Sequence, residues 1–176
     1  MTFAERTRAE HVMDLRAADA APHKERWPSA AQRIAEARSR ARLSEQQIAH
    51  RLNVTTQSYW DLENYDDEAF TAISLATLTT LGGILGVEPR ELLLGADAKN
   101  IDRTVTFSAI SARLAERLRR EGMTVEQLED RIGWNIEPVL IDPHALSEFN
   151  VEALYNICTA LDLDWVAALP SRPATL

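Results

Sequence analysis

Residue types that commonly catalyse reactions occur in this chain, but their spacing does not bring them together. Four histidines are scattered without a second ligand at metal-binding spacing, so we expect them at surface or cap positions. They are His11, His23, His50 and His144. The single cysteine, Cys158, excludes a disulfide within these 176 residues and is expected to be a buried small apolar residue. The carboxylate pairs Asp66-Asp67 and Asp162/Asp164 belong to no motif that would place them in a pocket.

Three glycines, Gly82, Gly83 and Gly86, superficially resemble a phosphate-binding loop. They lie inside an apolar helix pattern, with no strand pattern before them and no Lys-Ser/Thr after them. We therefore expect close helix packing and a helix C-cap at these positions. With no catalytic or ligand-binding pattern elsewhere, the sequence predicts a protein that is not an enzyme and needs no metal or cofactor.

The most informative spacing lies in residues 43–64, LSEQQIAHRLNVTTQSYWDLEN. Ser44 followed by Gln47 is a capping box, which predicts the start of a helix. Asn53 is a natural stop for that helix, and Thr55 can cap a second one. The spacing therefore predicts two helices joined by a short turn.

The second of these helices has two different faces. Tyr59 and Leu62 fall on its inward face, and the small Ala49 stands where the two helices must pass closely. The remaining polar and aromatic positions point elsewhere at i, i+4 spacing. They are Thr56, Gln57, Trp60 and Asp61.

This pattern resembles the Cro/repressor-type (XRE-like) helix-turn-helix of bacterial and phage regulators, over roughly residues 34–94. The matching positions are Ile34, Arg38, Ser44, Ile48, Ala49, Leu52, Val54, Thr55, Leu62, Glu63 and Asn64. The later stretch LTTLGGILGVEPRELLL fits the fourth and fifth helices of such a domain. The resemblance also implies that Arg38 pairs with Glu63 and ties the first helix to the end of the recognition helix.

The resemblance further implies that Thr56 and Gln57, at the start of the recognition helix, read base edges in the major groove. A Gln amide can bind adenine in a bidentate manner. Thr55 would contact phosphate as well as cap the helix. The wider set expected at a DNA interface is Thr55, Thr56, Gln57, Trp60, Asp61, Arg42 and Arg51.

Three departures from the family pattern leave a second interpretation open. Glu45 stands where the family often has a phosphate-binding Gln, and Asp61 places a carboxylate on the outward face. The loop after Glu-Asn starts with Tyr65 and continues with acidic residues, where the family usually has Gly. Trp60 beside this loop could instead anchor a protein partner.

Charge is unevenly distributed along the chain, whose formal net charge is −8. Residues 24–60 hold seven bases and three acids, a net of +4, whereas residues 61–70 hold five acids and no base. Residues 101–176 hold seven bases and twelve acids, a net of −5. The basic segment could steer the chain toward phosphates. Its arginines could equally be only the solvated face of the first helix.

Caps and breakers predict the organisation of the chain. The helices of the first domain are expected near residues 30–41, 45–52, 56–63, 75–85 and 89–94. The parts expected are an N-terminal helical arm (1–23), the helix-turn-helix domain (24–95), a linker (96–106), a second helical domain (107–170) and a C-terminal tail (171–176).

The second domain is predicted to be a degenerate copy of the first. A shift of 80 residues aligns Ser44 with Thr124, and a shift of 76 aligns Leu78 with Leu154. In this copy Glu129 replaces the small Ala49, and Leu118 replaces Arg38. Two prolines, Pro138 and Pro143, fall within or beside the segment of the second recognition helix, which they would interrupt. The copy is therefore expected to mediate self-association rather than bind DNA.

The sequence thus predicts an all-α protein of tandem five-helix, lambda-repressor-like domains with an extra N-terminal helix. The expected function is that of a sequence-specific, DNA-binding transcriptional regulator, a homodimer with recognition helices in major grooves roughly 34 Å apart. The alternative is a protein-interaction module on the same scaffold, such as an antitoxin, immunity or anti-activator protein. No apolar run is long enough for a membrane span and no secretory segment is visible, so a soluble, cytoplasmic protein is expected.

Overall fold

The structure is a computed structural model that describes residues 30–100 and 105–172, with the side chains of residues 99 and 100 excepted. The regular structure over these residues is helical, as predicted, with one isolated β-bridge. The expected N-terminal arm and the C-terminal tail beyond residue 172 lie outside the described residues.

The first half of the described chain contains the helices that the sequence predicts, together with two short ones that it does not. Its elements are α2 (Ala30–Ala41), α3 (Glu45–Leu52), α4 (Thr56–Asn64), α5 (Glu68–Thr71), α6 (Leu75–Leu85), α7 (Pro89–Leu94) and the 3-10 helix η1 (Ala96–Asn100). The unpredicted elements are α5, in the acidic loop, and η1, in the expected linker.

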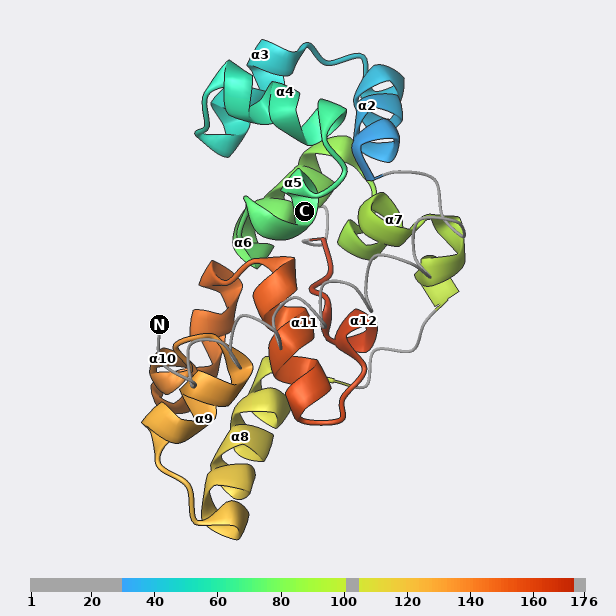
Figure 1. The fold of residues 1–176 in the computed structure, drawn as a ribbon. Helices are drawn as coiled ribbons and strands as arrows, with labels where there is room; N and C mark the ends of the chain where they lie inside the picture. The colour runs from blue at the N-terminus through green and yellow to red at the C-terminus, as the bar shows by residue number, and fades with distance from the viewer. Residues whose placement is uncertain (1–29, 101–104, 173–176) are drawn as a thin grey trace.

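The apolar α6 lies at the centre of this half and packs against α2, α3 and α7 (Figure 1). Leu75, Leu78 and Leu81 are fully buried along it because their spacing of three residues keeps them on one face. A Cβ on Gly82 would lie 2.7 Å from the carbonyl oxygen of Val87, so this glycine allows the close packing that was predicted. Gly86 ends the helix at a φ of 69°, as a C-cap glycine does.

The second half contains six elements. They are α8 (Phe107–Glu121), α9 (Val125–Ile132), α10 (Glu137–Ile141), the 3-10 helix η2 (Pro143–Glu148), α11 (Val151–Ala160) and α12 (Trp165–Ala168). Its apolar residues belong to the same core as those of the first half, since buried side chains form one continuous cluster. Figure 1 shows α3 and α4 at one end of the molecule, α8 and α9 at the other, and α6 and α11 between them.

Cys158 lies in this core and is fully buried, as the sequence predicts. Burial raises the pKa of its thiol to about 12, and the nearby Asp164 carboxylate acts in the same direction. Because thiolate rather than thiol is the nucleophile, this cysteine is unreactive in the folded protein.

Candidate nucleic-acid interface

The candidate interface is built on α3 and α4, which are joined by a short turn, and local side-chain hydrogen bonds define where each helix starts. Ser44 and Gln47 form the predicted capping box, with Gln47 N–H donating to Ser44 Oγ at 3.2 Å and Ser44 N–H donating to Gln47 Oε1 at 2.8 Å. Asn53 ends α3 in the left-handed region at a φ of 57°. Thr55 Oγ1 accepts from Ser58 N–H at 3.0 Å and starts α4. These local contacts define where α3 begins and ends and where α4 begins.

Inward-facing side chains then hold α4 against the rest of the first half. Tyr59 and Leu62 are buried on its inner face, as predicted, against α2 and α3. Ala49 is 2% exposed on α3. A larger side chain there would separate α3 from its neighbours, because a packed interior has no spare volume for it.

Arg38 on α2 and Glu63 near the end of α4 form a bidentate ion pair. Arg38 Nε lies 2.6 Å from Glu63 Oε1, and Arg38 Nη2 lies 2.8 Å from Glu63 Oε2. Tyr59 Oη–H donates to Glu63 Oε1 at 2.7 Å, so the carboxylate has donors from two elements. Its side chain is only 6% exposed. The pair fixes the C-terminal end of α4 and leaves the N-terminal end to face outward.

The Arg38 guanidinium also lies near Glu45, the residue expected to repel phosphate. The distance from Arg38 Nη2 to Glu45 Oε1 is 3.8 Å, and the Glu45 side chain is 36% exposed. The pKa of Arg38 is raised, mainly by its hydrogen bond to Glu63, so the guanidinium remains charged. The positive charge of Arg38 therefore offsets part of the negative charge of the Glu45 carboxylate.

The outward face of α4 presents polar groups from its first two turns. Thr56 and Gln57 are exposed and Asp61 is half-buried. Gln57 Nε2–H donates to Asp61 Oδ1 at 2.9 Å, one turn along the same face. This bond uses one amide N–H and leaves the carbonyl oxygen and the other N–H of Gln57 available to a ligand.

The far end of the same face carries two exposed aromatic rings. Trp60 is 38% exposed and Tyr65 is 51% exposed, and their ring centroids lie 6.0 Å apart in an edge-to-face arrangement. The neighbouring Asp66 Oδ1 accepts from the N–H of Ala31 at 3.4 Å, at the start of α2. One member of the acidic loop thus contacts the N-terminal end of a helix, a contact that the sequence does not predict.

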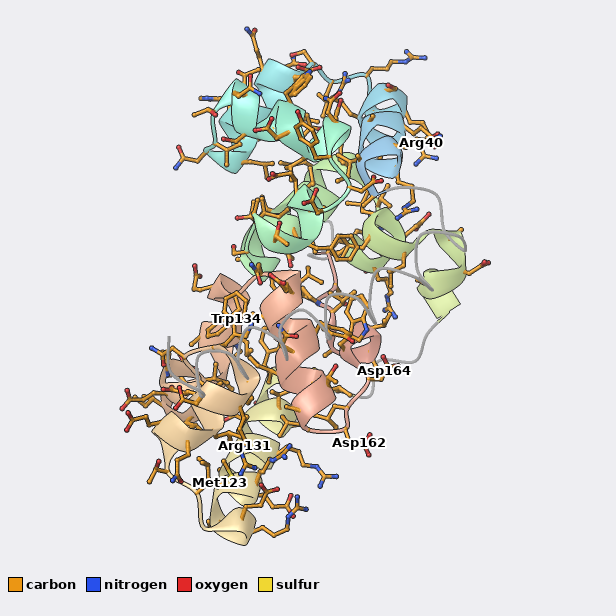
Figure 2. The ribbon with its side chains drawn as sticks, viewed as in Figure 1. Arg40, Met123, Arg131, Trp134, Asp162 and Asp164 are labelled. Atoms are coloured by element: carbon orange, nitrogen blue, oxygen red, sulfur yellow. The ribbon has the colours of Figure 1, made fainter. Side chains whose placement is uncertain are left out.

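The basic segment contributes fewer surface charges than its sequence suggests. Arg33 is half-buried and donates from Nε to the carbonyl of Leu92 at 2.7 Å and from Nη2 to the carbonyl of Leu93, at the end of α7. Arg38 is paired with Glu63. The arginines that remain exposed in the described part of this segment are Arg40, Arg42 and Arg51, of which Figure 2 labels Arg40 on α2. Two of these, Arg42 and Arg51, are the predicted phosphate contacts.

The corresponding segment of the second half repeats the caps of the first. Thr124 and Gln127 form a capping box with bonds of 3.2 and 3.0 Å, and Gly133 ends α9 at a φ of 82°. The equivalents in the first half, 80 residues earlier, are Ser44, Gln47 and Asn53. Similar caps at equivalent positions indicate that the two helices start and end for the same local reasons.

The helix that follows differs, because α10 has five residues where α4 has nine. Pro138 lies in its first turn and Pro143 starts η2 immediately after it. Glu129, in the position of Ala49, reaches the start of α10 and accepts from the N–H groups of Ile136 at 2.8 Å and Glu137 at 3.1 Å. Asn135, 80 residues after Thr55, also accepts from Glu137 N–H through its Oδ1 at 3.2 Å, so the Glu129 carboxylate shares the capping of α10 with it.

No family model matches this chain, and no curated protein or solved structure is similar enough to indicate a relationship. Within residues 30–100 and 105–172, no group of three or more His, Cys, Asp or Glu side chains is placed to hold a metal ion. No helix in these same ranges has the length and apolar character that crossing a bilayer requires.

Proposed function

We propose that this chain is a sequence-specific DNA-binding protein of the transcriptional-regulator class, in which the first turn of α4 enters the major groove. The observation that carries the proposal is the exposure of Thr55, Thr56 and Gln57 at the start of a helix whose opposite face is buried. A helix held firmly from behind, with exposed polar side chains at its N-terminal end, meets the requirements for reading base edges.

The proposal includes the fold. In it α2, α3, α4, α6 and α7 are the five helices of a Cro/repressor-type domain, and α8 to α12 form a second, degenerate copy. The repeated caps of α3 and α9 support this tandem, lambda-repressor-like organisation. The proposal includes a cytoplasmic location, because the regulators that the sequence resembles are bacterial and phage proteins and act where the DNA lies.

Gln57 is the proposed base reader. Its carbonyl oxygen and its second amide N–H match the donor and acceptor that adenine presents in the major groove. Asp61 orients the amide by accepting from its first N–H at 2.9 Å. Arg42 and Arg51 flank this helix and supply charge to phosphates, each contributing about 0.9 to the slope of log affinity against log salt concentration.

The test is selection from random-sequence duplexes with the full chain at two salt concentrations, followed by affinity measurements on variants. We expect an enriched consensus whose affinity falls with salt. Arg51→Ala should weaken binding, while Arg113→Ala is the matched control because that arginine is exposed on α8, away from α4. Absence of an enriched sequence, with no effect of Gln57→Ala or Arg51→Ala on affinity, would contradict the proposal.

One specific observation favours a second candidate, a protein-interaction module without DNA binding. The edge-to-face pair of Trp60 and Tyr65 is exposed beside acidic residues, and aromatic side chains commonly anchor protein interfaces. On this candidate Trp60→Ala would abolish partner binding, whereas Gln57→Ala would leave it unchanged. If the chain is a DNA-binding regulator, Gln57→Ala should reduce DNA affinity more than Trp60→Ala does.

A further inference from the structure

The two halves of the chain start equivalent helices with equivalent caps. Ser74 Oγ accepts from Thr77 N–H at 3.1 Å at the start of α6, and Asn150 Oδ1 accepts from Ala153 N–H at 2.8 Å at the start of α11. The two caps are 76 residues apart in sequence, the same shift that aligns the leucines of these helices. The same shift places α5 inside η2, so these two short helices are equivalents as well.

The equivalent caps lie directly opposite each other. Ser74 and Asn150 form an antiparallel β-bridge, and Leu75 N–H donates to the carbonyl of Phe149 at 2.7 Å. Opposite residues of an antiparallel pair are related by a local two-fold axis between them. Because Ser74 and Asn150 occupy the same position in the two halves, this axis relates one half to the other.

Packing around the bridge follows the same symmetry. Helix α5 packs against α11, and η2, the equivalent of α5, packs against α6, the equivalent of α11. Asn150 Nδ2–H also donates to the carbonyl of Thr71 at 2.7 Å, which closes the contact on one side. Figure 1 shows α6 and α11 meeting in the middle of the molecule. A contact to which each partner offers its equivalent patch is the isologous arrangement of a two-fold dimer.

We infer that residues 105–172 occupy, within one chain, the place that a second copy of residues 30–100 would take in a dimer, so that the protein works as a monomer. The second half was expected to mediate self-association because of its apolar helices. In the structure those helices pack on the first half, which removes the reason for expecting a homodimer.

Residues 30–100 and 105–172 leave little apolar surface for another copy to cover. Among the residues that the structure describes, the large apolar side chains that stay exposed are Trp60, Tyr65 and Ile141. The first two lie at the end of α4 and the third at the end of α10, toward opposite ends of the molecule (Figure 1). A stable homodimer buries on the order of 1,200–2,000 Å² with an apolar centre, which one aromatic pair and one distant isoleucine do not provide.

The two halves of this internal pair differ in their capacity to read DNA, and this consequence rests on the proposed function. Helix α4 has nine residues with exposed polar side chains at its start, whereas α10 has five and holds the Glu129 carboxylate at its N-terminus. A carboxylate at that position repels phosphate and occupies the amides. The monomer therefore has one reading helix, and its binding site should lack two-fold symmetry.

The experiment measures the mass of the full chain by sedimentation equilibrium, alone over a wide concentration range and bound to a selected duplex. We expect 19.7 kDa for the free protein, one chain per duplex, and a consensus without a palindrome. Two chains on a palindromic site would overturn the inference and leave the proposed function intact. A monomer that enriches no sequence would refute the proposed function while supporting the internal pairing.

Hydrogen exchange in the free monomer tests the pairing without DNA. The Leu75 amide should be protected to the same degree at all protein concentrations, because its acceptor, Phe149, belongs to the same chain. Asn150→Ala should accelerate its exchange, whereas Thr124→Ala, which removes a comparable cap from α9, should not. Protection that appears only at high concentration would overturn the inference.

Discussion

Removing the guanidinium of Arg38 tests whether the ion pair with Glu63 holds the candidate reading helix in place. In Arg38→Ala the Glu63 carboxylate, whose side chain is 6% exposed, loses two charged donors at 2.6 and 2.8 Å. It retains the hydroxyl of Tyr59 at 2.7 Å as a donor. The variant therefore leaves a buried charge with one neutral hydrogen-bond donor where the native protein supplies three.

The size of the effect follows from this burial. Removing one partner of a buried ion pair costs about 3–5 kcal/mol. We expect about 3 kcal/mol here, the lower end of that range, because Arg38 is partly exposed and Tyr59 still stabilises the carboxylate. For a chain of this length, that loss lowers the thermal midpoint by about 6–12 °C.

The assay is thermal and urea unfolding of Arg38→Ala, Glu63→Ala and the double variant. Coupling between the two sites should be about 1–3 kcal/mol, since the double variant leaves no unpaired charge. Arg113→Ala is the control, because its ion pair with Glu116 is exposed on both sides and should contribute less than about 1 kcal/mol. A thermal midpoint unchanged in both Arg38→Ala and Glu63→Ala would refute the reasoning.

Three further predictions concern reading, capping and reactivity. Gln57→Ala should reduce the free energy of DNA binding by about 1–3 kcal/mol at the selected site and relax specificity at one position, whereas Arg51→Ala should weaken binding to all sequences alike. If a competition assay shows equal effects of the two substitutions, this assignment of roles is wrong. Glu129→Ala should lower the free energy of unfolding by about 1–3 kcal/mol and accelerate hydrogen exchange of the amides that start α10. Glu126→Ala, which removes an exposed carboxylate from α9, the helix that carries Glu129, is the control. Cys158 should resist alkylation in the native state and react rapidly in denaturant. Because its pKa is raised, Cys158 also contributes stability that is complete below pH 9.0 and is lost as the pH rises toward about 12. Measuring the unfolding midpoint of the native protein and of Cys158→Ala over this pH range checks this expectation.

The helix ends were predictable because their causes are local. The capping boxes at Ser44 and Thr124 and the C-caps at Asn53 and Gly133 each involve residues within a few positions of one another. Apolar spacing likewise predicted the inward face of α4. Short elements such as α5 and η2 were missed, because four to six residues are too few to show a period.

The site was predicted less completely than the fold. The pairing of Arg38 with Glu63 was expected from a family resemblance, and the structure contains it. The number of basic side chains available to phosphate was overestimated, since Arg33 donates to carbonyls at the end of α7, 59 and 60 residues away in sequence. A count of charges along the sequence does not distinguish an arginine used inside the fold from one that faces solvent.

The sequence by itself determined the all-helical class and the ends of the main helices, because caps and hydrophobic periods act within one or two turns. Only the tertiary structure decided how the halves combine, through the bridge between Ser74 and Asn150 and the packing of α11 on α5. It also decided that Glu129 caps α10. The bridge and the packing of α11 on α5 depend on the path of the chain between distant residues, and the Glu129 cap depends on the turn that brings α9 beside the start of α10. In none of these pairs does one residue carry a local signal for its partner.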